Sequence, residues 1–409
     1  MKIRSIVSAA LVVTLLLSGC GSAAQNGSSW SNGSSESNDA SESNGSGSSA
    51  SSGVETEEKT PELTLEQKVG QLFIIRPDVL DSETYTAEQC NDVKAEGATE
   101  VNDAIRTNIK KYQVGGVCQF SKNILDPDQI TKFNADLQSA SDIPMFIAVD
   151  EEGGTVARIA GNDGFSIENV GSMNLIGKSG DTDKAYEVGV TIGTYLSDLG
   201  FNVDFAPVAD VLTNSENQIV AKRSFGSDSE LVTNMVLAEM KGFEETGILS
   251  CVKHFPGHGC TIGDTHEGYA YTDKTREELQ QEELVPFQEA CANGVPFVMV
   301  AHISAPNVIG DNTPSSLSPV MITDILRNEW NYDGIVITDA LNMGAIVQNY
   351  SSADAAVKAL QAGADMLLMP ENFQEAYQGV LDALENGTLT QEQIDCSVRR
   401  ILNVKLSMQ

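Results

Sequence analysis

Positive charge is scarce in this sequence. Its 409 residues include 25 Lys and Arg against 58 Asp and Glu, which gives a formal net charge of −33. Nucleic acid phosphates are bound by basic surfaces, so the composition excludes nucleic acid as the main partner. Adhesion to anionic lipid through a basic patch is disfavoured for the same reason.

Cysteines are few, and their spacing is typical of neither a disulfide framework nor a zinc site. The chain has 7 Cys, of which Cys20 belongs to the N-terminal segment described next. The other six are widely spaced and contain no C-x-x-C pair, so we predict no zinc site from them. Cys118 and Cys251 lie in apolar runs that are typical of buried strands, where a free cysteine acts as a small hydrophobe.

The apolar run at residues 5–17 is too short to span a bilayer comfortably. It follows Lys2 and Arg4 and ends at Leu17-Ser18-Gly19-Cys20, which resembles a bacterial lipobox. We therefore expect residues 1–20 to be a lipoprotein signal peptide, with Cys20 lipidated as the mature N-terminus once the residues before it are removed. A plain secretory signal with a chance cysteine is the alternative.

Residues 21–60 are rich in Ser, Gly and Asn. Such a segment buries too little apolar surface to offset its ordering entropy, so we predict a disordered, flexible tether. The expected organisation is a signal at 1–20, a linker at 21–60 and one catalytic domain at 61–409. The expected location is the cell membrane, with the domain lipid-anchored and facing outside the cytoplasm.

From Pro61 onward, apolar runs alternate with helical patterns. Runs that are apolar throughout are typical of strands buried on both faces, as in parallel sheets. Eight such units predict a (β/α)₈ TIM-type barrel, with a doubly wound open sheet as the alternative. The predicted strands are Phe73–Ile75, Val114–Phe120, Pro144–Val149, Phe201–Phe205, Leu249–Val252, Pro296–Ala301, Gly334–Thr338 and Asp365–Met369. The predicted helices lie near 127–140, 183–199, 229–246, 275–292, 319–329, 353–362, 373–385 and 390–406, and 78–112 is expected to be an insertion or helical excursion.

Polar residues follow most of these predicted strands. The runs V-D-E-E-G-G (149–154), K-H-F-P-G-H-G (253–259) and T-D-A (338–340) are examples, and Asp204, Asp210 and His302 occupy similar places. All strands of a barrel end at one face, where active sites are built. Charged groups directly after buried runs cost desolvation free energy unless they are paired or used, so we predict a functional site at this face.

These motifs also resemble a known family. K-H-F-P-G-H-G followed by D-T-H, together with V-D-E-E-G-G, K-R-S-F and I-T-D-A, resembles glycoside hydrolase family 3, and within it the NagZ-type β-N-acetylglucosaminidases. The resemblance covers about Leu63 to Leu406. This sequence departs from the family pattern at Ala340, where several relatives carry a second Asp. The difference bears on local hydrogen bonding rather than on the nucleophile itself.

Retaining glycoside cleavage needs an anionic nucleophile and a proton donor. Asp339, at a strand end, suits the nucleophile, while capping of the next helix is its alternative role. For the donor, the resemblance implies His266, oriented by Asp264 in the loop after the fifth strand. An imidazole titrates near neutral pH, so it could first donate a proton and then accept one from water. A turn residue and a solvated loop histidine are the alternatives for these two.

The resemblance further implies that Asp150, Arg158, Arg223, Lys253 and His254 contact the sugar. We expect His258 and Asp204 to support the loop and the barrel mouth instead. His254 and His258 have the spacing of helical zinc ligands, but Pro256 and Gly257 between them prevent a regular helix, so no metal or other cofactor is expected.

Four activities remain open. The expected one is a retaining exo-β-N-acetylglucosaminidase that releases terminal β-linked GlcNAc from peptidoglycan fragments or related glycosides. The alternatives are a phosphorylase, a broader β-glucosidase of the same family, and a non-catalytic sugar-binding lipoprotein. The expected partners are a GlcNAc-containing carbohydrate and, through the lipid anchor, a membrane.

Overall fold

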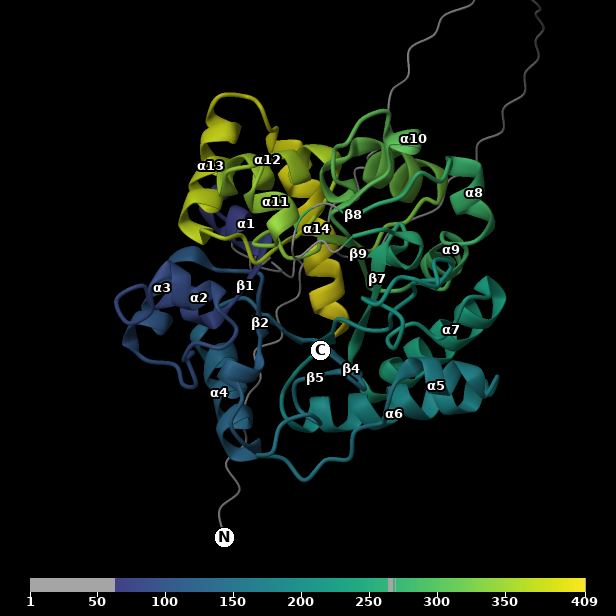
Figure 1. Ribbon diagram of the computed structural model, residues 1–409. Helices are drawn as coiled ribbons and strands as arrows, with labels where there is room; N and C mark the ends of the chain where they lie inside the picture. The colour runs from purple at the N-terminus through teal and green to yellow at the C-terminus, as the bar shows by residue number, and fades with distance from the viewer. Residues whose placement is uncertain (1–62, 264–267, 269, 409) are drawn as a thin grey trace, which may run out of the picture. The chain divides into compact units, whose positions relative to one another are not determined.

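The computed structural model of the protein describes residues 63–263, 268 and 270–408 (Figure 1). The predicted signal, linker and lipidation site Cys20 lie outside these residues, as do the predicted acid–base residues Asp264 and His266.

Eight parallel strands form the predicted barrel. Their order is β11-β9-β7-β6-β3-β2-β1-β12, and a parallel bridge between Ile337 of β11 and Met366, directly before β12, joins the two ends. This bridge makes the sheet cyclic, so the open doubly wound alternative is wrong. The strands are β1 (Phe73–Ile75), β2 (Gly116–Gln119), β3 (Phe146–Val149), β6 (Val203–Asp204), β7 (Leu249–Phe255), β9 (Phe297–Val300), β11 (Ile335–Thr338) and β12 (Leu367–Leu368).

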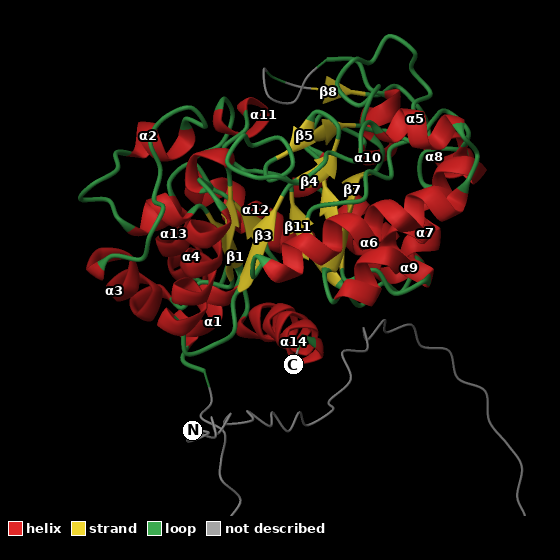
Figure 2. Cartoon of the chain, turned by 90° about the horizontal axis from the view of Figure 1, so that it is seen from below, coloured by secondary structure: helices red, strands yellow, loops and turns green. Residues whose placement is uncertain are grey.

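Helices connect successive strands and lie around the barrel (Figures 1 and 2). The α-helices are α1 (Leu65–Gln71), α2 (Ala87–Asn91), α3 (Asp103–Tyr112), α4 (Pro127–Ala140), α5 (Met173–Lys178), α6 (Thr182–Asp198), α7 (Ser229–Thr246), α8 (Arg276–Gln281), α9 (Val285–Ala292), α10 (Pro306–Ile309), α11 (Gly344–Val347), α12 (Ser352–Ala362), α13 (Phe373–Glu385) and α14 (Gln391–Ser407). Short 3₁₀ turns are η1 (Pro77–Leu80), η2 (Ser121–Asn123), η3 (His258–Cys260) and η4 (Ser315–Leu317), and η5 (Val320–Glu329) is a π-helix.

Side-chain caps determine where several helices begin. Asp126, Asp228 and Asn372 each accept a hydrogen bond from the backbone N–H three residues later, which satisfies one donor that the first helical turn leaves free. Gly247, at a φ of 77°, ends α7 in the left-handed conformation that glycine adopts without strain. These local signals are why the predicted bounds of α4, α7 and α13 are confirmed.

Two predicted elements near the fifth strand differ most from the structure. The helical pattern at 275–292 is interrupted between α8 and α9, because Pro286 near the start of α9 has no N–H and cannot continue a helix from the preceding turn. The fifth predicted strand continues beyond Val252, so that Lys253 and His254 lie within β7 rather than after it. Their charged or polar ends are paired with carboxylates, which makes this extension into the barrel mouth tolerable.

The two ends of the barrel differ in chemistry. At the amino ends of β3 and β9, the rings of Phe146 and Phe297 pack edge to face, and Lys405 of α14 lies 4.9 Å from the Phe146 ring. The carboxyl ends carry two small sheets, β4 (Glu151–Gly153) with β5 (Val156–Ala157) and β8 (Ala270–Tyr271) with β10 (Ile303–Ser304). Figure 2 shows α14 near one end of the strands and β4, β5 and β8 near the other. In the described part of the chain, no helix is both long and apolar enough to cross a membrane.

Candidate active site

A buried lysine is the centre of the site. Lys253, near the end of β7, places its Nζ 2.7 Å from Asp150 Oδ1 and 2.6 Å from Glu152 Oε1. Burial alone would lower the pKa of Lys253, but the two carboxylates outweigh burial and raise it. The side chain of Asp150 is 20% exposed, whereas that of Glu152 is only 2% exposed. Asp150 therefore faces the mouth of the barrel with one oxygen held by Lys253.

Glu152 connects this lysine to Arg223. Its carboxylate accepts Arg223 Nε and Nη2, both at 2.7 Å, in a two-bonded pair. Burial alone would raise the pKa of Glu152, but Arg223 and Lys253 together lower it far below its ordinary value. Glu152 thus stays ionised and holds the guanidinium of Arg223 and the ammonium of Lys253 side by side. The sequence placed Glu152 in a motif but assigned it no role.

The imidazole of His254 is held from both sides. Its Nδ1 lies 2.7 Å from Asp210 Oδ2, and its Nε2 lies 3.2 Å from Arg223 Nη2. A guanidinium can only donate, so Nε2 accepts from Arg223 and Nδ1 donates its proton to Asp210. The network therefore selects one proton position on His254.

Asp210 also organises the backbone beyond β7. Its Oδ1 accepts the backbone N–H of His254 at 3.2 Å and that of His258 at 2.5 Å. Burial alone would raise the pKa of Asp210, but His254 and His258, through charge and hydrogen bonding, outweigh it and lower the pKa. Sequence reasoning left Asp210 undetermined, because its partners lie 44 and 48 positions away.

Asp339 follows β11 and is half-buried at the same face. Its Oδ1 accepts the backbone N–H of Ala340 at 2.8 Å. Helix α11 begins at Gly344 after Met343, so Asp339 is not its N-cap, and the capping alternative is wrong.

His302, directly after β9, holds the other side of that peptide segment. Its Nε2 lies 2.9 Å from the carbonyl oxygen of Ala340, and its Nδ1 lies 2.7 Å from Ser316 Oγ. Since a carbonyl only accepts, Nε2 carries the proton that it donates. Ala340 is thus held at its N–H by Asp339 and at its C=O by the fully buried His302. The sequence identified His302 as a strand-end residue and assigned it no role.

The remaining predicted residues take different places. Arg158 lies with its guanidinium carbon 5.4 Å from the Phe120 ring, on which Arg76 also lies at 4.5 Å. Asp204 accepts the backbone N–H of Glu151 at 2.9 Å, which agrees with the supporting role expected for it. Burial raises the pKa of Asp204 well above its ordinary value.

The loop after β7 is anchored at both ends. Ile262 and Tyr271 exchange two backbone hydrogen bonds of 3.0 Å as an antiparallel pair, and β8 continues by pairing with β10. Farther along, Lys274 Nζ lies 2.5 Å from the buried Glu283, which also accepts the hydroxyl of Thr213 at 2.5 Å. The predicted acid–base pair lies in sequence between Ile262 and Tyr271, outside the described residues, and stays a prediction.

Hydrogen bonds occupy three of the four ring nitrogens of His254 and His258, and the buried His258 Nε2 has no hydrogen-bond partner among the described residues. Both nitrogens of His254 are engaged, and His258 Nδ1 is bonded to Thr261 Oγ1 at 2.7 Å. Within residues 63–263, 268 and 270–408, no group of three or more His, Cys, Asp or Glu side chains is placed to hold a metal ion. The six cysteines of this part of the chain are free, and Cys118 and Cys251 are buried.

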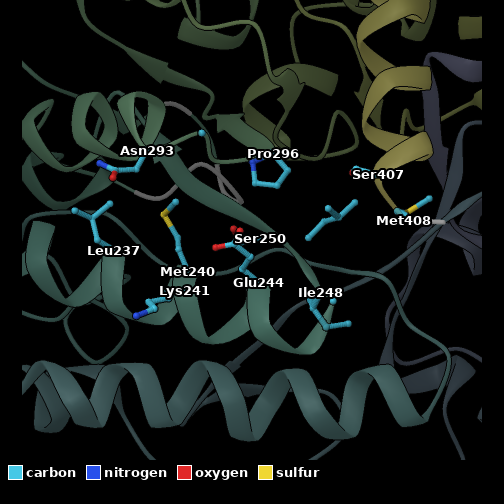
Figure 3. A pocket seen from close by; sticks show the side chains of 13 residues that line it. Leu237, Met240, Lys241, Glu244, Ile248, Ser250, Asn293, Pro296, Ser407 and Met408 are labelled. Carbon is cyan, nitrogen blue, oxygen red and sulfur yellow. The ribbon is translucent and has the colours of Figure 1, made fainter.

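A cavity of about 540 Å³ lies elsewhere (Figure 3). Its lining includes Gly247, Ile248 and Leu249 before and at the start of β7, and Pro296 before β9. These helix-to-strand connections mark the amino ends of the strands, opposite the charged network. Because barrel active sites are built at the carboxyl ends, this cavity is not the candidate active site.

Comparisons with known proteins agree with this geometry. A model of the glycosyl hydrolase family 3 N-terminal domain matches residues 64–404. "Beta-hexosaminidase A" of Pseudoalteromonas piscicida is 35% identical over 377 residues, which are 85% of this chain and 62% of the relative. "Beta-hexosaminidase" of Chromobacterium violaceum is 34% identical over 282 residues, which are 68% of this chain and 77% of the relative.

A solved structure, a glycoside hydrolase family 3 β-N-acetylglucosaminidase from Paenibacillus sp. strain FPU-7, has a TM-score of 0.76 and 38% identity. The match covers 85% of this chain and 63% of that one. The chain thus spans less than two thirds of the Pseudoalteromonas and Paenibacillus proteins. The domain match, the identities and the shared barrel show that this chain belongs to glycosyl hydrolase family 3.

Proposed function

We propose that this protein is a retaining exo-β-N-acetylglucosaminidase that releases terminal β-linked GlcNAc from peptidoglycan fragments or related glycosides. The observation that carries the proposal is the convergence of Asp150, Lys253, Glu152, Arg223 and His254 through direct contacts at the barrel face that also holds Asp339. The names of the relatives support the N-acetyl preference.

The network suits a ring with many hydroxyl groups. The partly exposed carboxylate of Asp150 can accept two hydroxyl hydrogen bonds, while Arg223 and His254 line the same mouth. Because Glu152 and Asp210 already neutralise or orient these groups, the site keeps its geometry without a ligand. Such preorganisation is what lets a protein hold a sugar in position for attack.

The reaction proceeds in two displacements. A carboxylate oxygen of Asp339 forms a bond to C1 as the bond between C1 and the leaving oxygen breaks, and that oxygen takes a proton from His266. Water then attacks C1, gives its proton to His266, and releases Asp339. Two inversions at C1 retain the β configuration. Asp264 would orient His266 and stabilise its charged form.

Substitution of the nucleophile tests the proposal. Asp339→Asn keeps the shape of the side chain but removes its charge, so we expect kcat to fall on the order of 10⁴-fold or more for both an aryl β-GlcNAc and a GlcNAc disaccharide. Asp198→Asn, at an exposed position at the end of α6, is the matched control. Product configuration by NMR should show retention, and inversion would contradict the mechanism.

Leaving-group dependence tests the proton donor separately. His266→Ala should lower turnover of a poor leaving group about 10²–10⁴-fold, and that of a nitrophenyl glycoside far less, because a nitrophenolate departs without protonation. Equal losses on both substrates would contradict the role of His266. Running the reaction with and without phosphate identifies the acceptor, since preferential sugar 1-phosphate formation would show a phosphorylase instead.

We also propose that the protein is a lipoprotein held at the cell membrane, outside the cytoplasm, by lipidated Cys20. The support is the sequence Leu17-Ser18-Gly19-Cys20 after a short apolar run. Metabolic labelling with a radioactive fatty acid should mark the wild-type chain and not Cys20→Ser. Equal labelling of the two would overturn the anchor.

A further inference from the structure

A second cavity, of about 420 Å³, lies between the segments that follow β6 and β7. One wall is formed by residues 214 and 216–219, after β6, and the other by residues 260–263, after β7. The two walls are tied to each other, because Asn214 Nδ2 donates to the carbonyl oxygen of Thr261 at 2.9 Å and Asn217 Nδ2 donates to that of His258 at 2.8 Å. The cavity is therefore bounded by cross-linked segments rather than by two independent loops.

Both walls continue directly into the candidate active site. The first leads to Arg223, whose N–H donates to the carbonyl oxygen of Val220 at 2.9 Å. The second follows His254 and His258, whose rings lie 6.0 Å apart, edge to face. The cavity walls are thus continuous in the chain with Arg223 and His254, two residues of the candidate active site.

Under the proposed function, on which this inference rests, the leaving group lies on the side of the site that contains the segment after β7. The proton donor expected after Gly263 in the chain has to reach the glycosidic oxygen. Because that donor follows Gly263 in the chain, we expect the sugar that contains this oxygen to bind next to residues 260–263. Residues 260–263 form one wall of the cavity, so the cavity lies directly beside them.

The lining has a distinctive charge. Among the lining residues that the structure describes, Glu216 is the only one charged at neutral pH, because burial raises the pKa of the Cys260 thiol to about 12. Glu216 and Gln218 are exposed and offer oxygen and amide groups to hydroxyl or acetamido partners. Ile262 is 56% exposed and offers an apolar surface to the face of a sugar ring.

We propose that this cavity is the leaving-group subsite and that it selects uncharged sugars, such as a second N-acetylhexosamine, over sugars that carry a carboxylate. Glu216 repels an anionic leaving group, and the lining supplies no Lys or Arg to neutralise one. The net charge of −33 acts in the same direction at long range. Within the proposed function, the geometry therefore favours related glycosides such as oligosaccharides of N-acetylglucosamine over peptidoglycan fragments whose second sugar carries a lactyl carboxylate.

Two disaccharides test this selectivity. Values of kcat/KM are measured at low salt for GlcNAc-β-1,4-GlcNAc, which is neutral, and GlcNAc-β-1,4-MurNAc, which carries a carboxylate. We expect the wild type to prefer the neutral substrate and this preference to shrink as added salt screens the charge. A preference for the charged disaccharide, or equal rates, would overturn the proposal.

Variants assign the effect to the cavity. Glu216→Gln should raise the ratio of kcat/KM for the charged over the neutral disaccharide about two- to fivefold, and Glu216→Lys should raise it further, as is typical of solvent-exposed charge pairs. Glu385→Gln, on an exposed residue at the end of α13, is the matched control and should leave the ratio unchanged. Ile262→Ser should raise KM for the disaccharides more than for an aryl β-GlcNAc.

The outcomes separate the two proposals. Hydrolysis of the aryl β-GlcNAc, with a ratio that does not respond to Glu216, would refute the subsite and leave the proposed function standing. Absence of hydrolysis of all three substrates by a folded wild-type protein would refute the proposed function itself.

Discussion

Replacement of Asp210 by Asn should disable the site although Asp210 is not itself a residue expected to contact the sugar. In the wild type, Oδ1 of Asp210 accepts hydrogen bonds from the backbone N–H groups of His254 and His258, and Oδ2 accepts one from His254 Nδ1. An amide has one accepting oxygen, and the two backbone donors require it. The NH₂ group of the substituted side chain then faces His254 Nδ1. Because this NH₂ group only donates, Nδ1 can accept from it only after losing its own proton.

The displaced proton of His254 would move to Nε2, which lies 3.2 Å from Arg223 Nη2. Two donors would then face each other, and Arg223 and His254 could not keep their present contact. Loss of one charge-assisted hydrogen bond costs about 1.5–3 kcal/mol. With the added repulsion, a total of about 2–4 kcal/mol corresponds to a fall in kcat/KM of about 30- to 1,000-fold.

The assay is kcat/KM on an aryl β-GlcNAc, with urea unfolding as a check on folding. Asp198→Asn, an exposed substitution of the same type, is the control and should behave as wild type. A folded Asp210→Asn protein with kcat/KM within about twofold of wild type would refute the argument that Asp210 selects the proton position on His254.

Three further outcomes are expected. Burial raises the pKa of Glu239 to about 8 from an ordinary 4.5, so the folded state keeps a proton that the unfolded chain releases, and stability should fall as pH rises from about 4.5 to 8. Glu239→Gln cannot titrate and so should not lose stability in this way. Measured by urea unfolding, the free energy of unfolding of Glu239→Gln minus that of wild type should grow by on the order of 1.4 kcal/mol per pH unit between about pH 4.5 and 8. A difference that stays constant with pH would contradict the raised pKa of Glu239. His302→Gln should weaken the hydrogen bond to the Ala340 carbonyl oxygen, at a cost of about 1–3 kcal/mol. Because Ala340 follows the nucleophile Asp339, we expect a lower kcat with little change in KM. A change in KM alone would contradict a role of His302 in positioning Asp339. In Gly177→Ala, the new Cβ would lie 1.7 Å from the carbonyl oxygen of Phe225. The free energy of unfolding in urea should therefore fall by about 1–3 kcal/mol or more. A variant as stable in urea as the wild type would show that α5 can accommodate the methyl group.

Much of the fold could be predicted because its signals are local. Eight apolar runs separated by helical patterns indicated eight buried parallel strands, and the structure shows Asp126 and Asp228 capping α4 and α7 at the predicted starts. The polar residues directly after these runs located the functional face, since parallel strands in a barrel all end there.

The sequence by itself therefore determined the barrel and the face that holds the candidate site. Only the tertiary structure decided how the charges at that face are paired: Glu152 bridges Lys253 and Arg223 across separations of 101 and 71 positions, and Asp210 holds His254. Barrel closure brings these groups within hydrogen-bonding distance, and their burial then makes each unpaired charge costly enough to require a partner. Periodicity along a chain records which residues are buried, but it contains no information on which distant residue meets which.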